Sequence, residues 1–344
     1  MKNIFISTYT DEWHSPAMIL HERLGFVIVE LKGKIYPSIS SKRILMKKEI
    51  NNTINIIRHL KVINDSNIII CSNYVMLFLL FLRKVRVLKC RELIWFGVYI
   101  HNPQMIKLVK YTISSFMPKN FGFRMVVFSK SEIGLYSSKL GLHSSSIIYV
   151  PYGDWGKTFI NIEAKDKGYY FSGGYSNRDY VTLAKYFWGR EEKLVIIASK
   201  QNFGFYDWVC KNTLPDNIQV FWDVTKEEFD EKLTNSHAIV LAMRYNTGAS
   251  AQMVILSAMQ NRKLVIATYT DCINEYIQNG KTGIVIDKLD DGFDISNCID
   301  ENQCNNVIEA AYEYYKQHFS YPAIAEQLVT SIREELMILG EKFT

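Results

Sequence analysis

A short stretch near the start of the chain contains residues that could carry out acid–base chemistry. Asp11, Glu12 and His14 follow the apolar run Ile4-Phe5-Ile6 closely. Carboxylates and imidazoles are the side chains that most often exchange a proton with a reacting group. Asp11 or His14 could act as a general base on a hydroxyl group. A polar surface loop ahead of a helix near Pro16 explains the same residues without chemistry.

A second histidine, His101, follows the strand-like run 93–96. In open α/β sheets the loops at the carboxyl ends of strands carry the ligand sites, which makes His101 a third catalytic candidate. An ordinary turn histidine ahead of Pro103 is the alternative.

Phosphate binding is indicated in the second half, where residues 167–172 lead into Gly173-Gly174. Paired glycines let the backbone approach a ligand closely, and a helix that begins just after them presents unpaired N–H groups to an anion. Arg178 adds a planar, permanent positive charge suited to phosphate. A tight turn with Arg178 paired to Asp179, and a surface lysine at Lys200, are the alternatives. The candidates are Gly173, Gly174, Tyr175, Asn177, Arg178 and Lys200.

A third group of candidates lies between Arg244 and Glu275. The small residues 247–251 open an apolar run with helical spacing, so the free N–H groups of that helix would face the loop. A packed mid-helix serine is the alternative for Ser257. The candidates are Arg244, Thr247, Gly248, Ala249, Ser250, Gln252, Ser257 and Glu275.

Strand-like apolar runs alternate with helical runs along the whole chain, which is typical of parallel sheets buried on both faces. A length of 344 residues with 48% apolar content favours two domains. Neither a G-x-G-x-x-G motif nor a P-loop lysine motif is present, which argues against a dinucleotide or P-loop site. The predicted strands are 3–7, 26–30, 67–71, 93–96, 125–129, 147–150, 167–174, 194–198, 217–221, 238–241, 264–268 and 283–286.

The stretch from Arg244 to Ile286 resembles the donor-binding region of family-4 glycosyltransferases, which have the GT-B fold. Residues 126–132, where Ser129 is expected to cap a helix, and 147–153 are also similar to that family. The matching segments are Leu256-Ser257-Ala258-Met259, Lys263-Leu264-Val265-Ile266-Ala267-Thr268, Glu275, Asn279-Gly280 and Thr282-Gly283.

The resemblance implies an α/β protein with two doubly wound, Rossmann-like parallel-sheet domains facing across a cleft. Residues 1–152 would bind the acceptor and residues 153–322 the nucleotide-sugar donor. Residues 323–344 would form a C-terminal helix that crosses back to the first domain. Its amphipathic pattern places Ile324, Leu328, Ile332 and Leu336 at four-residue spacing.

One departure from the family concerns its two glutamates, which grip the donor sugar and the ribose. The matching positions are Ala249 and Ser257, so both functions need other residues, and Ser257 or Glu275 is the expected ribose partner. No D-x-D motif is present. We expect no metal and no cofactor beyond the substrate, with cations and helix ends stabilising the leaving diphosphate.

Charge is distributed unevenly along the chain. Residues 1–152 hold 21 lysines and arginines against 8 acidic residues, an excess of +13, whereas the remainder carries −8. Basic residues 83–91 follow an apolar run, 74–82, that is too short to span a bilayer. Peripheral contact with an anionic membrane explains this pattern, and a buried helix with a solvated basic end is the alternative. Nucleic acid is disfavoured, because aromatic residues do not interleave with the basic ones.

Six cysteines without C-x-x-C spacing and a start without a secretory signal favour a cytoplasmic protein at the inner face of the membrane. We expect a metal-independent hexosyltransferase that moves sugar from a UDP- or GDP-sugar to a saccharide acceptor, lipid-linked, in bacterial-type surface polysaccharide or glycolipid assembly. Retention is the family's outcome, whereas a base at Asp11 or His14 would fit inversion. A non-hydrolysing sugar-nucleotide 2-epimerase and a catalytically silent GT-B binding subunit are the alternatives.

Overall fold

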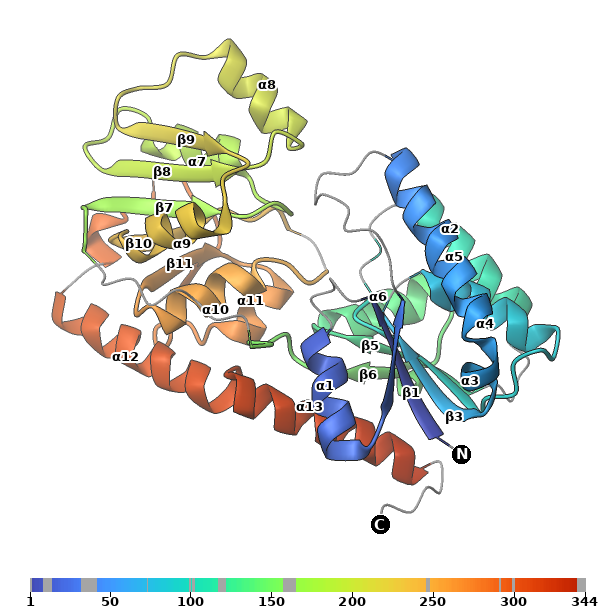
Figure 1. Cartoon of the computed structure of the whole chain (residues 1–344). Coiled ribbons are helices and arrows are strands. Elements are labelled where there is room, and N and C mark those ends of the chain that lie inside the picture. Colours follow the sequence, from blue (N-terminus) through green and yellow to red (C-terminus); the bar gives the residue numbers. More distant parts are fainter. Residues whose placement is uncertain are drawn as a thin grey trace. The chain divides into compact units, whose positions relative to one another are not determined.

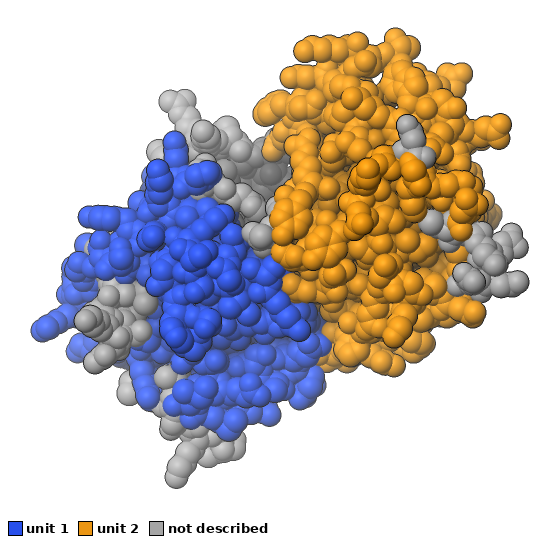
Figure 2. Space-filling model, turned by 180° about the vertical axis from the view of Figure 1, so that it is seen from behind, with its two compact units in different colours: residues 1–151, 324–344 blue, residues 152–323 orange. Residues whose placement is uncertain are grey.

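The computed structural model describes residues 2–8, 14–31, 42–72, 74–98, 100, 103–116, 122–156, 165–245, 248–290, 292–298 and 301–338. The chain forms two compact units (Figure 2). The first comprises residues 1–151 and 324–344, and the second comprises residues 152–323. Each unit is built on a six-stranded parallel sheet.

The sheet of the first unit has the strand order β2-β1-β3-β4-β5-β6. Ile4 pairs with Val27 on one side and with Ile69 on the other, in parallel register. The strands are β1 (Lys2–Thr8), β2 (Val27–Leu31), β3 (Ser66–Cys71), β4 (Glu92–Phe96), β5 (Gly122–Val127) and β6 (Ile147–Tyr149).

Helices cover both faces of this sheet (Figure 1). The helices α2, α4, α5 and α6 pack on one face, and α1 and α13 cover the other. A short 3₁₀ turn, η1 (Ser144–Ser146), precedes β6. The helices of this unit are α1 (His14–Leu24), α2 (Lys42–Arg58), α3 (Leu60–Asn64), α4 (Val75–Lys84), α5 (Pro103–Phe116), α6 (Ser131–Leu140) and most of α13 (Tyr321–Ile338).

The amphipathic C-terminal helix is confirmed. Ile324, Leu328, Ile332 and Leu336 are all fully buried. Because residues 324–344 belong to the first unit, the last helix returns to it, as expected from the resemblance.

The helix α4 explains the apolar run that precedes the basic residues. It buries Val75, Met76, Leu79, Leu80 and Leu82 and ends in the exposed Lys84. The buried-helix alternative is therefore right for this segment. None of the helices in the described part of the chain is long and apolar enough to span a bilayer.

The predicted capping role of Ser129 is wrong. Helix α6 begins at Ser131, and Lys130 occupies the cap position without a side-chain cap bond. Ser129 is buried instead, with its hydroxyl group 2.6 Å from that of Ser131. The Phe128 N–H donates to the Glu132 carboxylate at 3.2 Å, so a glutamate in the first turn supplies the local bond.

The sheet of the second unit has the order β9-β8-β7-β10-β11-β12. Counted within the unit this is the doubly wound order 3-2-1-4-5-6, whose direction reverses between β7 and β10. Every strand predicted from the sequence is present in the two sheets. The strands here are β7 (Tyr169–Gly173), β8 (Lys193–Ala198), β9 (Ile218–Trp222), β10 (Ala238–Leu241), β11 (Leu264–Thr268) and β12 (Ile284–Ile286).

Helices again lie on both faces. The helices α7 and α8 and the start of α12 pack on one face, and α9, α10 and α11 lie on the other. Helix α11 starts at Asp271, because the Thr270 hydroxyl accepts a bond from the Ile273 N–H and caps it. The helices are α7 (Tyr180–Phe187), α8 (Phe203–Lys211), α9 (Lys226–Thr234), α10 (Gln252–Gln260), α11 (Asp271–Tyr276), the 3₁₀ turn η2 (Ser296–Cys298) and α12 (Glu301–His318).

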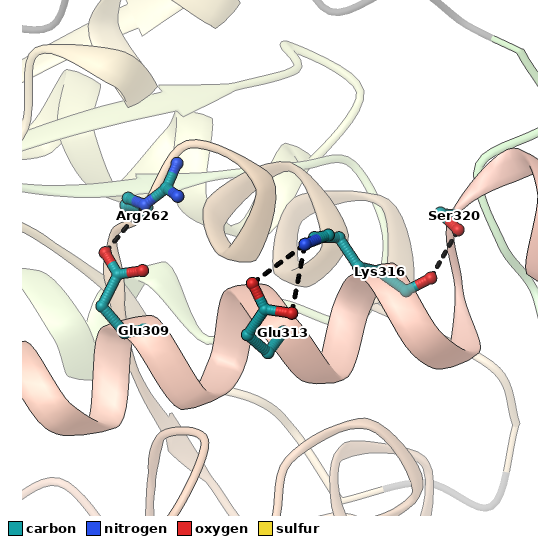
Figure 3. A network of polar contacts seen from close by, with 5 residues as sticks. All are labelled: Arg262, Glu309, Glu313, Lys316 and Ser320. Carbon is teal, nitrogen blue, oxygen red and sulfur yellow. Dashed lines mark hydrogen bonds and ion pairs between the residues drawn. The ribbon is translucent and has the colours of Figure 1, made fainter.

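The chain just after α10 is tied to α12 at the surface (Figure 3). Arg262 donates to Glu309 at 2.8 Å and lies 3.7 Å from the ring centre of Tyr312. Farther along α12, Lys316 bonds Glu313 at 3.0 Å. Exposed pairs of this kind contribute about 0–1 kcal/mol each, and of the two only the Arg262–Glu309 pair joins α12 to another segment, since Glu313 and Lys316 both lie in α12.

Candidate functional site

The loops after β7 and β10 form one hydrogen-bonded unit at the point where the strand order of the second sheet reverses. Arg178 and Met243 form an antiparallel bridge. The Arg244 N–H donates to the Asn177 carbonyl at 3.1 Å, and the Asn177 amide donates back to the Arg244 carbonyl at 2.5 Å. The structure therefore brings Asn177 and Arg244 together, two residues selected from distant parts of the sequence.

The guanidinium group of Arg178 lies inside its own loop, and the residue is only 3% exposed. It donates to the Gly173 carbonyl at 3.1 Å and to the Ser176 carbonyl at 2.8 Å. Asp179, the partner considered for it, caps α7 by accepting from the Thr182 N–H. The bonds of Arg178 brace the loop, and its direct contact with a phosphate stays a prediction.

The two glycines of this loop make room for neighbouring side chains. A Cβ atom on Gly173 would lie 2.5 Å from the ring of Phe229. Gly174 has a φ of +122°, and a Cβ atom there would lie 2.7 Å from Nη2 of Arg178. Packing alone thus accounts for both glycines, while the tip residue Tyr175 is 65% exposed.

Lys200 follows β8 at the same edge of the sheet and is exposed. Its backbone N–H donates to Oδ2 of Asp223 at 3.3 Å, and Asp223 in turn donates from its N–H to the Ala198 carbonyl at 3.0 Å. Oδ1 of Asp223 is buried without a hydrogen-bond partner. The ends of β8 and β9 are thereby joined, with Lys200 free to extend toward solvent.

Of the five described residues other than glycine that have a positive φ, three lie at this edge, whereas Arg86 and Arg262 lie elsewhere. Asn177, Asp223 and Ala251 all have positive φ values, of 58°, 50° and 70°. The left-handed conformation costs a non-glycine residue about 1–2 kcal/mol, and such strain is concentrated at functional sites. Three strained residues in loops after β7, β9 and β10 therefore mark one region of the second unit.

The N-terminus of α10 is the best candidate for an anion site. Ala251 occupies its cap position without a side-chain cap bond. Ser250 is 4% exposed, and its hydroxyl group is buried without a partner. Leaving a buried hydroxyl group unpaired costs about 1–3 kcal/mol, which a ligand oxygen would recover. Gly248 and Ala249 are buried in the same loop, and Thr247 lies outside the described residues.

The other two candidates on α10 are buried. Gln252 is 8% exposed, and its side-chain amide donates to the Tyr276 hydroxyl at 3.0 Å. Ser257 is 3% exposed in the middle of the helix, and its hydroxyl group has no partner. Glu275 lies half-buried on α11. Burial agrees with a packed role for Ser257, and its bond to a ribose stays a prediction.

The three catalytic candidates cannot be placed. Asp11 and His101 lie outside the described residues. His14 begins α1, but its side chain also lies outside them. Within the described ranges, no group of three or more His, Cys, Asp or Glu side chains is arranged to hold a metal ion.

A cluster formed by Tyr245, Tyr269 and Asp271 was not predicted from the sequence. Both tyrosine hydroxyl groups bond the aspartate. Their position just after β10 and β11 was the available signal, since strand ends at this edge carry ligand-binding side chains.

The two doubly wound units define the GT-B fold, and solved structures of glycosyltransferases share it over almost the whole chain. HepE from Anabaena, solved with UDP-glucose, aligns with a TM-score of 0.66 at 10% identity, covering 97% of this chain and 100% of its own. A glycosyltransferase from Rickettsia africae aligns with a TM-score of 0.65 at 15% identity, covering 97% and 99%. WaaG, a glycosyltransferase involved in lipopolysaccharide biosynthesis, gives 0.57 at 10% identity, covering 95% and 99%.

Residues 183–311 match the family model "Glycosyl transferases group 1". This match includes β8 to β12 and the α10 region on which the resemblance to family-4 enzymes rests. No curated protein sequence matches the chain. The resemblance is confirmed: the chain has the GT-B fold, and residues 183–311, within its second unit, match the model of the group 1 glycosyltransferases.

Proposed function

We propose that this protein transfers a hexosyl group from a UDP- or GDP-sugar to a saccharide acceptor that is linked to a lipid. The observation that carries the donor assignment is the uncapped N-terminus of α10 with the buried, unpaired hydroxyl group of Ser250 beside it. Helix N–H groups and a hydroxyl donor together suit a diphosphate. HepE, which shares the fold, was solved with UDP-glucose, and this makes UDP-sugars the first donors to try.

The leaving diphosphate would be stabilised by the protein's own charges, without a metal. Lys200 and Arg244 are exposed cations at the edge of the sheet. Arg178 would hold the loop between them in shape through its bonds to Gly173 and Ser176. Donors fixed in advance at the place where negative charge develops are the main source of rate enhancement in such reactions. Asp11, His14 or His101 would act on the acceptor hydroxyl group.

A membrane-bound acceptor is supported by the surface of the first unit. Apart from Met337 and Ile338, all its exposed large apolar side chains among the described residues lie between residues 50 and 111. They lie on and around α2, α4 and α5, which are neighbouring helices (Figure 1). These side chains are Ile50, Ile54, Ile57, Val62, Phe81, Val85, Val87, Leu108 and Tyr111, with exposures of 40–69%.

Basic residues alternate with apolar ones at the end of α4. Val85 and Val87 are exposed, and Lys84, Arg86 and Lys89 are exposed between and beside them. Apolar side chains insert at the lipid interface, and each basic residue near an anionic surface adds about 1 kcal/mol. WaaG, described as acting in lipopolysaccharide biosynthesis, supports the same kind of role in surface polysaccharide or glycolipid assembly.

The first experiment is a thermal-shift screen against nucleoside diphosphates and their sugars, because a ligand that binds the folded state raises apparent stability. The sugar nucleotide that raises the melting temperature most is then incubated with the protein, with and without lipid-linked saccharide acceptors. Acceptor-dependent release of nucleoside diphosphate supports the proposal. Conversion of the sugar nucleotide without any acceptor would indicate a 2-epimerase instead. Binding without turnover would indicate a silent GT-B subunit, for which the buried Ala249 and Ser257 at the glutamate positions are the argument.

A further inference from the structure

A carboxylate held between two tyrosine hydroxyl groups lies at the carboxyl edge of the second sheet. The Tyr269 hydroxyl donates to Oδ1 of Asp271 at 3.1 Å, and the Tyr245 hydroxyl donates to Oδ2 at 3.4 Å. Each carboxylate oxygen thus receives one bond. An ionised carboxylate has about four lone-pair sites, so each oxygen keeps capacity to accept another hydroxyl group.

This cluster adjoins the loop that begins α10. The thiol of Cys272, next to Asp271, donates to the Ser250 carbonyl at 3.5 Å. The cluster's own loop is fixed, because the Tyr269 N–H donates to the Ile286 carbonyl at 2.8 Å and Thr270 caps α11. Asp271 is therefore positioned beside the candidate diphosphate site by the backbone bond of Tyr269 on one side and the thiol bond of Cys272 on the other.

Large apolar and aromatic side chains are exposed along the same edge of the second sheet. Within the described residues of the second unit, most exposed large apolar side chains follow strand ends at this edge. Soluble proteins rarely gather such side chains without a binding role. They are Tyr175, Phe203, Tyr245, Met253 and Tyr269, with exposures of 40–70%.

Aromatic faces combined with a carboxylate suit a sugar. A pyranose ring has an apolar C–H face that packs on an aromatic ring. Its neighbouring hydroxyl groups can donate a pair of hydrogen bonds to one carboxylate. Tyr245 and Tyr269 are 66% and 40% exposed, so their rings are accessible to a ligand. The hydrogen bond to Asp271 raises the pKa of the Tyr269 hydroxyl group, so this phenol keeps its proton and continues to orient the carboxylate.

We propose that Asp271, oriented by Tyr245 and Tyr269, binds the hydroxyl groups of the sugar that is transferred. This inference rests on the proposed function, because a diphosphate at the N-terminus of α10 would place its attached sugar near the Ser250 loop that Cys272 contacts. The buried Ala249 in that loop carries no polar group. Asp271 supplies a carboxylate on the adjacent loop.

The test compares binding of UDP with binding of UDP-glucose, and of GDP with GDP-mannose, by calorimetry. Asp271→Asn keeps the size of the side chain but removes the charge. We expect it to leave affinity for the nucleoside diphosphate within about twofold of wild type. We expect it to lower the affinity for the sugar nucleotide about tenfold or more, because hydrogen bonds to charged groups are stronger than those between neutral groups. The matched control is Asp216→Asn, which makes the same change at an exposed residue preceding β9, at the opposite edge; both affinities should be unchanged.

A second variant guards against misfolding of the first. Tyr245→Phe with Tyr269→Phe keeps the rings and removes the two hydroxyl groups, and a smaller loss confined to the sugar nucleotide is expected. The inference fails if Asp271→Asn binds both ligands as tightly as wild type does. It also fails if wild type binds the sugar nucleotide no more tightly than the nucleoside diphosphate. In either case Asp271 does not bind the sugar, although the donor assignment stands. If wild type binds neither nucleoside diphosphates nor their sugars, the proposed function itself fails, which is a different result.

Discussion

The hydroxyl group of Tyr276 bonds both backbone groups of Tyr152. It accepts from the Tyr152 N–H at 2.8 Å and donates to the Tyr152 carbonyl at 3.1 Å. Tyr152 is the first residue of the second unit, and the same hydroxyl group accepts from Gln252 at the start of α10. One buried phenol therefore connects the candidate donor site with the point where the chain enters the unit.

Tyr276→Phe should destabilise the protein. The ring would keep its place against Phe319, whose centre lies 4.8 Å away, but the buried N–H and carbonyl groups of Tyr152 would lose their partner. Each unsatisfied buried group costs about 1–3 kcal/mol, and we expect a loss of that order in the free energy of unfolding in urea. Tyr321→Phe, at a residue that is 38% exposed, should change it by less than about 0.5 kcal/mol. If the two variants had equal free energies of unfolding, the bonds to Tyr152 would make no contribution to stability.

Gly174→Ala should lower both stability and nucleotide affinity. The new methyl group meets the Arg178 guanidinium at 2.7 Å, and the φ of +122° suits only glycine. Arg178 would have to release the loop that it braces. Gly204→Ala is the matched control, because Gly204 lies in α8 with nothing near its Cβ position, and alanine there should stabilise by about 0.5–1 kcal/mol. Melting temperature and calorimetric affinity for UDP or GDP give both readouts, and a Gly174→Ala variant with wild-type values would exclude the bracing role.

Asp11→Asn should lower turnover by orders of magnitude if Asp11 is the general base, since asparagine cannot accept the proton. The donor should bind as before, because only the chemical step is affected. Turnover is measured as nucleoside diphosphate released in the presence of acceptor. Near-normal turnover would transfer the role to His14 or His101, whose glutamine variants are measured alongside.

The stability of the first unit should decrease with rising pH through two carboxyl groups. Arg124 forms ion pairs with Glu92 at 3.3 Å and with Glu335 at 2.7 Å, yet burial raises the pKa of Glu92 above 4.5 and also raises that of Glu335. A folded-state pKa above the unfolded value means that the folded state binds more protons in the interval between them. The free energy of unfolding therefore falls as pH rises from about 4.5 through the folded pKa.

Glu92→Gln should flatten part of that decline. The measurement is urea unfolding of wild type and variant from pH 4 to pH 7, with the exposed Glu22→Gln as control. A variant whose profile stays parallel to that of wild type would contradict the assignment to Glu92.

Val85→Ser with Val87→Ser, and separately Arg86→Gln with Lys89→Gln, should weaken binding to vesicles that contain anionic lipid. The first pair removes exposed apolar area and the second removes charge, so only the second should change the salt dependence. Cosedimentation with anionic and neutral vesicles is the assay. Lys211→Gln, at an exposed lysine of the second unit, should have no effect. Binding by all variants alike would place the membrane contact elsewhere.

The sheets were predictable because their strands are short, apolar and separated by helical patterns. The strands 238–241 and 264–268 were placed to the residue, since burial on both faces leaves an unbroken apolar run with polar ends. The loops that carry the candidate site were predictable in position, because strand ends follow from the same pattern. The direction of side chains was not: Arg178 turns inward, which residue type does not encode. Asp271 and Tyr245 meet only through the pairing of β10 with β11, which no local window contains.

The first unit is assembled from two stretches that lie far apart in the sequence, residues 1–151 and 324–344. During synthesis, residues 1–151 leave the ribosome long before residues 324–338, whose stripe of Ile324, Leu328, Ile332 and Leu336 is fully buried in the finished protein. Before residues 324–338 are synthesised, the sheet of the first unit lacks part of its apolar cover. All residues of the second unit have been synthesised by residue 323. The first unit can therefore bury its full apolar surface only after the whole second unit has been synthesised, and apolar surface that is exposed in the meantime favours aggregation.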